Sequence, residues 1–189
     1  MTDAAGFDAG FESRLEAARS GEDWAWEAIY AEMAPRVLSY LRANRAPDPE
    51  DLLGEVFLGA VRDLSSFHGG AQELRAWLLT IAHHRLVDAR RRSARRPEVP
   101  DSDALETIGP VGDAEHEALA RLGTERVGQL LEQLTEEQRA VLLLRIVGDL
   151  SIDQVAQALG KRAGAVKQLQ RRGLLAVRRA LTEEEGANQ

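Results

Sequence analysis

Apolar residues recur every three or four positions along much of the chain, which is the period of an α-helix that buries one face. The first stripe begins near Asp23 and comprises Ala25, Ile29, Met33, Val37 and Leu41. Pro35 lies inside it and predicts a kink or a new helix start, because proline lacks a backbone N–H and clashes with the preceding turn. Two further stripes comprise Leu52, Leu53, Val56, Phe57, Ala60, Val61 and Leu64, and then Leu74, Trp77, Leu78, Ile81, Leu86 and Ala89.

Capping residues predict where several helices begin. Asp48-Pro49 indicates a helix start, because an aspartate side chain caps a helix and proline is favoured in the first turn. The segment 65–70, rich in serine and glycine, has turn composition and separates the second stripe from the third. Farther along, Thr135 and Ser151 each precede a glutamine by three residues, which is the capping-box pattern. Each of these boxes therefore predicts a helix start.

The end of the chain has the spacing of a helix-turn-helix. The short helix opened by Ser151 ends at Gly160, and a longer helix is expected from about Arg162 to Leu181. The angle between the two helices is expected to be filled by Val155, Leu159, Val166, Leu169 and Leu174.

Between the apolar stripes lies a segment in which the periodicity fades and proline, glycine and acidic residues accumulate. We therefore expect an all-α protein of two small helical domains joined by a flexible acidic linker. The expected layout is an N-terminal tail at 1–22, a first domain at 23–96, a linker at 97–123, a second domain at 124–182 and a C-terminal tail at 183–189.

Charge is segregated along the chain, so the net charge of −7 does not by itself argue against nucleic acid. Residues 85–96 hold six arginines against one aspartate, and residues 161–181 hold seven bases and no acid. The chain has no cysteine, which excludes disulfides and thiolate metal sites. No apolar run is long enough for a membrane helix, so we expect a soluble, cytoplasmic protein with no membrane insertion.

The second basic block has the residues that a recognition helix needs in the major groove. Small residues at Gly164 and Ala165 allow close approach, Gln168 can meet a base edge, and the bases can neutralise phosphates. A solvated basic face is the simpler alternative, and the adjoining turn and capping box argue against it. In the segment before the first block, Phe67 and Trp77 are more often core residues than platforms for bases, and for Trp77 we favour the core.

Two sets of motifs, in order, resemble the extracytoplasmic-function sigma factors of the sigma-70 family. The stretches 48–58, 66–69 and 74–82, followed by Arg90-Arg91-Arg92, are similar to region 2. The stretches 134–145, 150–156 and 164–167 are similar to region 4. The resemblance covers about 24–96 and 127–181.

The resemblance implies roles for particular residues. Core RNA polymerase would bind Glu50, Asp51, Leu53, Glu55 and Phe57. The minus-ten promoter element would be opened and read by Phe67, His68, His84, Arg85 and Arg91. The minus-thirty-five element would be read by Lys161, Arg162, Gly164, Lys167, Gln168 and Arg171. Many relatives have asparagine where this chain has His84, so the minus-ten base preference is not carried over.

The implied function is that of an alternative sigma factor, which binds core RNA polymerase and promoter DNA to initiate transcription of a specific regulon. An anti-sigma factor is the expected restraining partner. The mechanism needs no catalytic residue, cofactor or metal, so we expect no enzyme activity. A stand-alone helix-turn-helix regulator is the main alternative, against which the region 2 match argues. A metal-dependent hydrolase is a remoter one, since the histidines lack a ligand pair at helical spacing.

Overall fold

The computed structural model describes residues 4–95 and 126–187, and every regular element in these ranges is helical. The expected all-α fold is therefore confirmed. The expected linker at 97–123 lies outside the described residues. The helices are α1 (Ala4–Arg19), α2 (Asp23–Ala43), α3 (Pro49–Asp63), α4 (Ala71–Arg95), α6 (Glu136–Ile146), α7 (Ile152–Ala158) and α8 (Ala163–Ala187), with a short 3-10 helix at Leu64–Ser66. Residues 126–132 are also helical.

The predicted caps form as the sequence indicates. The Asp48 side chain accepts a hydrogen bond from the backbone N–H of Asp51, 3.1 Å away, at the start of α3. Both capping boxes are complete, with Thr135 and Gln138 opening α6 and Ser151 and Gln154 opening α7. Each box satisfies backbone donors that a helix start otherwise leaves unpaired, so these starts are fixed by local chemistry.

The N-terminal segment departs from the expected tail. Residues Ala4–Arg19 form α1, and the side chains of Phe11, Leu15 and Ala18 are buried. These residues stand on one face of α1 at spacings of three and four, and α1 packs on α2 and α4. The segment is therefore part of the first domain.

Two other helices run farther than expected. α2 continues through Pro35 as one helix, so no new helix starts there, and the proline itself is exposed. α8 extends to Ala187 and so includes most of the expected C-terminal tail at 183–189. Leu174 on α8, expected to fill the helix-turn-helix angle, is 48% exposed, whereas Val155 and Val166 are fully buried there.

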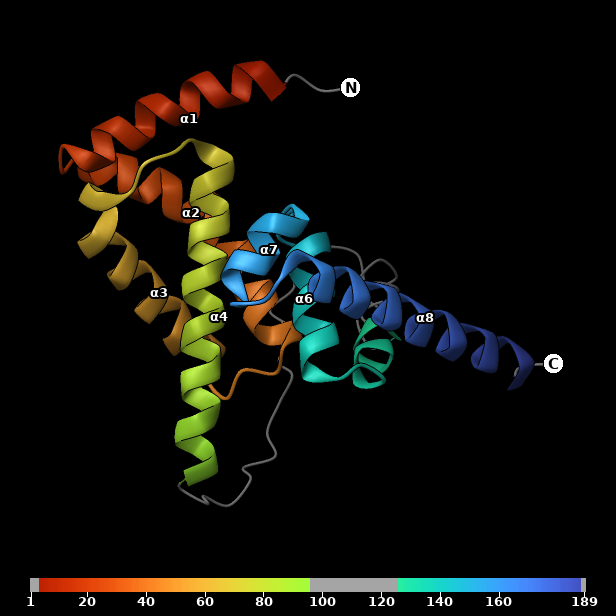
Figure 1. Cartoon of the computed structure of the whole chain (residues 1–189). Helices are drawn as coiled ribbons and strands as arrows, with labels where there is room; N and C mark the ends of the chain where they lie inside the picture. The colour runs from red at the N-terminus through yellow and green to blue at the C-terminus, as the bar shows by residue number, and fades with distance from the viewer. Residues whose placement is uncertain (1–3, 96–125, 188–189) are drawn as a thin grey trace, which may run out of the picture.

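One apolar core runs through both halves of the protein. α4 lies between α3 on one side and α7 on the other (Figure 1), and α2 touches both α3 and α6. Buried residues of the first half, such as Leu79 and Leu86, belong to the same cluster as Leu144 and Leu150 of the second half. The two expected domains are therefore docked on each other. Among the described residues, no helix has both the length and the apolarity to cross a membrane.

Candidate nucleic-acid interface

The outer face of α8 is free to meet a ligand. Its inner face packs on the protein through Val166, which is fully buried, and through Gly173, where an added Cβ would lie 3.0 Å from Leu142 Cδ1. The opposite face is exposed and carries Gly164, Ala165, Lys167, Gln168, Arg171 and Arg172, and Arg162 is exposed in the turn just before α8. A helix that follows a tight turn and presents small and basic residues outward has the form of a recognition helix for the major groove.

One residue predicted to contact DNA, Lys161, forms an ion pair within the protein. Lys161, in the turn before α8, is half-buried, and its Nζ lies 2.6 Å from Glu137 Oε1 at the start of α6. This ion pair ties the turn to α6. Four other residues predicted for the minus-thirty-five element lie on the exposed face of α8, namely Gly164, Lys167, Gln168 and Arg171, and Arg162 is exposed just before it.

The residues predicted for the minus-ten element lie on a loop and on α4. His68 is exposed at the loop, whereas Phe67 is buried and stacks on Trp77 with ring centroids 5.0 Å apart. Phe67 therefore supports the loop from below. His84 is exposed on α4, thirteen residues beyond Ala71, which is about 20 Å along a helix, so His68 and His84 do not form one compact site.

The arginines of α4 are held by acidic neighbours. Arg85 Nε lies 3.7 Å from Glu55 Oε2, and Arg92 Nη2 lies 3.9 Å from Glu55 Oε1. Arg91 is exposed and lies 3.7 Å from Asp88. Glu55, predicted to bind the polymerase, therefore also joins α3 to α4.

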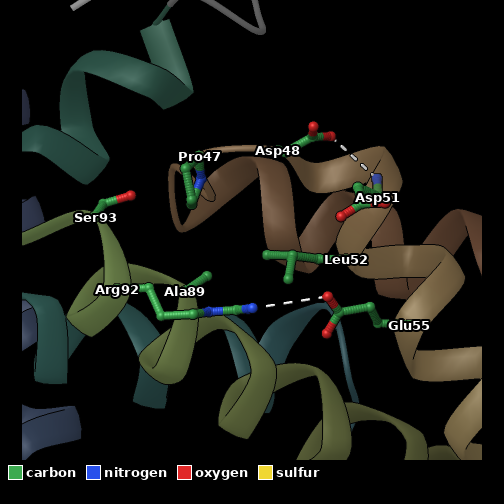
Figure 2. A pocket seen from close by; sticks show the side chains of 8 residues that line it. All are labelled: Pro47, Asp48, Asp51, Leu52, Glu55, Ala89, Arg92 and Ser93. Atoms are coloured by element: carbon green, nitrogen blue, oxygen red, sulfur yellow. Dashed lines mark hydrogen bonds and ion pairs between the residues drawn. The ribbon is translucent and has the colours of Figure 1, made fainter. Parts of the chain in front are cut away.

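A pocket opens where the start of α3 meets the end of α4 (Figure 2). Its volume is about 360 Å³, and it is lined by Pro47, Asp48, Asp51, Leu52, Glu55, Ala89, Arg92 and Ser93. Its wall carries carboxylates from α3 and the Arg92 guanidinium from α4. No group of three or more His, Cys, Asp or Glu side chains in the described part of the chain is placed to hold a metal ion.

The five residues predicted to bind the polymerase divide by burial. Glu50 and Asp51 are exposed and Glu55 is half-buried, whereas Leu53 and Phe57 are in the core. A hydrogen bond from Arg42 to Glu50, with Nε 3.1 Å from Oε1, holds the pKa of the Glu50 carboxyl below its usual value. The exposed face of α3 also carries large apolar residues, since Leu58 is 73% and Val61 51% exposed.

Family models and relatives agree with this architecture. The model described as "Sigma-70 region 2" matches residues 29–96, and the one described as "Sigma-70, region 4" matches residues 124–177, so together they cover well over half of the chain. The extracytoplasmic-function (ECF) RNA polymerase sigma factor ShbA of Streptomyces griseus is 31% identical, over 87% of this chain and 91% of that protein. The chain belongs to the ECF sigma factors.

Other relatives differ from this sigma factor in length and in sequence identity. The ECF RNA polymerase sigma factor BldN of Streptomyces coelicolor is 29% identical, and the match covers 90% of this chain but only 65% of BldN. The solved structure of the sigma factor RpoE from Bartonella quintana, in complex with the anti-sigma factor NepR, aligns with a TM-score of 0.65 and 18% identity. That alignment covers 82% of this chain and 96% of RpoE, and it shows a shared fold.

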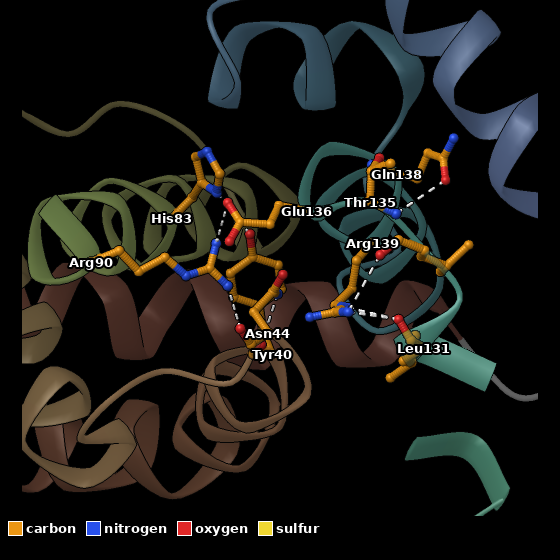
Figure 3. Close-up of polar contacts among 10 residues, drawn as sticks. Tyr40, Asn44, His83, Arg90, Leu131, Thr135, Glu136, Gln138 and Arg139 are labelled. Atoms are coloured by element: carbon orange, nitrogen blue, oxygen red, sulfur yellow. Dashed lines mark hydrogen bonds and ion pairs between the residues drawn. The ribbon is translucent and has the colours of Figure 1, made fainter. Parts of the chain in front are cut away.

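In this sigma factor, region 4 is docked on region 2 through arginine–acid pairs. Arg75 of α4 lies 3.6 Å from Asp149, Arg90 of α4 lies 3.2 Å from Glu136, and Arg45 pairs with Glu132. Arg90 also donates to the Asn44 carbonyl, so it joins α2, α4 and α6 (Figure 3). In each pair the arginine belongs to region 2 and the acid to region 4.

An apolar seam lies beside these pairs. Leu150 of region 4 is 1% exposed, and Gly148 lies so close to α4 that an added Cβ would be 2.6 Å from Leu79 Cδ1. His83 of α4 is half-buried nearby, and its Nδ1 shares a hydrogen bond of 2.9 Å with the hydroxyl of Tyr40. Burial, followed by the positive charges of His84, Arg90 and Lys161, lowers the pKa of His83 to about 4.

The sequence had not indicated some of these features. Leu58 and Val61 could have been found as apolar positions on the outer side of α3, although Val61 had been grouped with the buried stripe. His83 stands in phase with buried Leu79 and Leu86, which is the signal that it faces inward while His84 faces outward. The arginine–acid pairs between the regions left no signal in the local sequence.

Proposed function

We propose that this alternative sigma factor binds core RNA polymerase through α3, reads a minus-ten element through α4 and its preceding loop, and reads a minus-thirty-five element through α8. The observation that carries the proposal is that exposed cationic helices stand in both regions, in the order that the sigma-70 family requires. Binding energy drives the opening of DNA, so the chain needs no catalytic group. The protein would act in the cytoplasm, where the polymerase is.

The α8 surface suits duplex DNA. Lys167, Arg171 and Arg162 supply charge for phosphates, and Gly164 lets the backbone approach the groove. Gln168 offers an amide with both a donor and an acceptor, which is the chemistry that reads adenine in the major groove. Lys161 contributes mainly by holding the turn through Glu137.

The α4 surface suits unpaired bases. His84 on α4 and His68 on the preceding loop are exposed aromatic rings with hydrogen-bonding nitrogens, and Arg91 is an exposed cation that could neutralise a phosphate. Arg85 of α4 lies 3.7 Å from Glu55 of α3, and this ion pair limits its movement. Phe67 acts indirectly, because its buried ring stacks on Trp77 and supports the loop.

The polymerase surface is the exposed face of α3. Glu50, Asp51 and Glu55 supply negative charge there, and Leu58 and Val61 supply an apolar patch that a monomer does not bury. Leu53 and Phe57 would act through the core by fixing the position of the helix. This combination of apolar centre and polar surround is typical of protein interfaces.

The docked arrangement must open before both elements can be bound. Elements about 25 base pairs apart are separated by about 85 Å along B-form DNA, at about 3.4 Å per base pair. With α7 lying against α4, the two reading helices belong to one body and cannot span that distance. Core polymerase would therefore capture an opened form, in which α4 and α7 have separated.

An anti-sigma factor would act on the same equilibrium. The fold likeness to RpoE, whose solved structure contains the anti-sigma factor NepR, supports such a partner. A partner that covers α3 would compete with the polymerase, and a partner that favours the docked form would lower the open population. Either action restrains transcription without altering the DNA-reading residues.

Run-off transcription with purified core RNA polymerase and a library of genomic fragments tests the function. We expect transcripts that depend on this protein and share two spaced upstream elements. A lack of transcripts, together with binding to duplex DNA without polymerase, would instead support the stand-alone regulator. The matched control is the same polymerase without the protein.

A further inference from the structure

The loop that carries His68 is tied to a helix outside the matched region 2. α1 ends at Arg19, ten residues before the family match begins at 29. The Arg19 guanidinium donates to the backbone carbonyl of Phe67 across 48 positions of sequence, with Nη2 2.9 Å from the oxygen. Arg19 also pairs with Glu16 of its own helix at 3.1 Å, which orients the guanidinium.

The loop is also held by its own neighbours. The Phe67 ring stacks on Trp77 of α4, and the Gly70 N–H donates to Glu73 Oε2 at 3.0 Å. Gly69 has a φ of +147°, and an added Cβ there would lie 2.5 Å from Glu73 Cβ, so a side chain is excluded. The far end of the loop is therefore fixed by Glu73 of α4, and the near end by Trp77 at the Phe67 ring and by Arg19 at the Phe67 backbone.

The exposed group that this framework carries is the ring of His68. Its Nδ1 lies 2.9 Å from the Ser66 carbonyl oxygen. A carbonyl oxygen only accepts, so Nδ1 must carry the proton in this contact, and the neutral ring then leaves Nε2 as an acceptor. An acceptor at this position can pair with the exocyclic amino group of an unpaired base.

We propose that Arg19 is a positioning residue for minus-ten recognition: it fixes the backbone at Phe67 and thereby sets where His68 meets an unpaired base. The inference rests on the proposed function of the loop. It extends the reading site to α1, which contains none of the residues predicted to contact DNA. Loss of the tether would free the backbone at Phe67, while Trp77 still holds the Phe67 ring and Glu73 still holds Gly70.

Arg14 offers a matched control on the same helix. Its Nη1 lies 3.1 Å from Glu32 Oε2 of α2, and its guanidinium lies over the Phe11 ring at 5.4 Å from the centroid. Arg14→Ala therefore removes an α1 arginine and its ion pair without touching the loop. Arg19→Lys keeps a cationic donor at the tether.

The experiment uses holoenzyme formed from the full chain and core polymerase. Its template is a promoter that the run-off transcription experiment has identified. Preference for each base of the minus-ten element is measured by competition between promoters with single substitutions, alongside the minus-thirty-five footprint and the thermal midpoint. We expect Arg19→Ala to reduce the preference for the best minus-ten base over the substituted bases about tenfold. This is the size of effect expected for loss of a hydrogen bond to a charged group. Arg19→Lys should restore most of it, and the minus-thirty-five footprint should stay unchanged.

Two results would overturn the inference. The first is an unchanged preference ratio in Arg19→Ala. The second is an equal loss in Arg14→Ala, which would trace the effect to general packing of α1. Failure of the wild-type holoenzyme to make any transcript is a separate outcome, because it would remove the proposed function before any variant is compared.

Discussion

The imidazole of His83 lies at the contact between the regions, beside the buried Tyr40 hydroxyl and close to Arg90 and Lys161. Burial raises the pKa of the Tyr40 phenol well above its usual range, so Tyr40 stays protonated. Burial also makes the charged form of His83 unfavourable, and the surrounding cations add to this effect. His83 is therefore a neutral hydrogen-bonding partner in the folded protein near neutral pH.

This surrounding predicts a pH dependence of stability. The pKa of His83 is about 4 in the folded protein against 6.5 ordinarily, so the unfolded chain binds an extra proton between these values. The free energy of unfolding should be unaffected above pH 6.5, fall by up to about 3 kcal/mol as the pH drops to 4, and then level off.

Denaturant unfolding across this range measures the effect. The control is His83→Gln, which offers Tyr40 a hydrogen-bonding group that does not titrate. The wild type should lose more stability than the variant between pH 6.5 and pH 4. Parallel profiles for the two proteins would contradict the prediction.

For single residues, the sequence predicts which side chains of a regular helix are exposed better than it predicts what each side chain contacts. Exposure of Arg162, Lys167 and Gln168 follows from helical phase once Val166 is placed inside. Burial of Phe67 and Phe57 agrees with their expected core positions, although the resemblance also implies DNA and polymerase contacts for them. Such residues satisfy both patterns, and only packing decides between them.

Among the helices, α3 contains a glycine that the fold does not need. An added Cβ at Gly54 would meet nothing within 4 Å, whereas one at Gly148 would lie 2.6 Å from the Leu144 carbonyl oxygen. Gly54→Ala should stabilise the protein by about 0.5–1 kcal/mol, because alanine loses less backbone entropy in a helix. Gly148→Ala should destabilise it. Thermal midpoints compare the two, and a lower midpoint for Gly54→Ala would contradict the expectation.

The exposed face of α8 predicts a salt dependence. Lys167→Ala and Arg171→Ala should each weaken binding of the holoenzyme to promoter DNA and reduce the slope of log K against log salt by about 0.9, since each phosphate contact releases counterions. Gln168→Ala is the control. Loss of a contact between a neutral side chain and a base should change base preference but leave the slope of log K against log salt unchanged. An unchanged slope in both cationic variants would exclude these phosphate contacts.

Element starts were predictable where a capping residue fixes them, as at Asp48, Thr135 and Ser151. α1 was missed because its apolar positions are separated by glycine, alanine and acidic residues, so its helical period is weak. A new helix start at Pro35, one of the two expected alternatives, does not occur, because packing of Met33 and Val37 on the core outweighs the lost backbone hydrogen bond. Tertiary contact supplies what local sequence does not show.

For the whole molecule, the docking of region 4 on region 2 was beyond sequence reasoning. The pairs that join the regions involve acids that are largely exposed, 72% for Glu136 and 74% for Asp149, and such residues look like ordinary surface. Exposed ion pairs contribute under about 1 kcal/mol each and weaken in salt. The docked form is therefore held weakly at its polar edge, which suits the proposal that this contact opens on the polymerase.

Neighbouring glutamates in the first turn of α6 allow a direct test of this contact. Glu136 pairs with Arg90 of region 2, whereas Glu137 pairs with Lys161 inside region 4. Glu136→Arg replaces the attraction by repulsion and should shift the ratio of docked to open chains about tenfold toward open. Glu137→Arg is the control, because both variants remove an acid from the first turn of α6 and so lose the same favourable interaction with the helix dipole. Glu137→Arg should nevertheless leave the regions docked.

Energy transfer between dyes on the two regions measures the docked fraction, and the chain suits such labelling because it has no cysteine of its own. Combining Glu136→Arg with Arg90→Glu restores opposite charges across the contact and should restore docking. Open chains should also form holoenzyme faster, because core polymerase would no longer wait for the regions to separate. Equal energy transfer in Glu136→Arg and Glu137→Arg would mean that the apolar seam at Leu79, Gly148 and Leu150 alone sets the docked state.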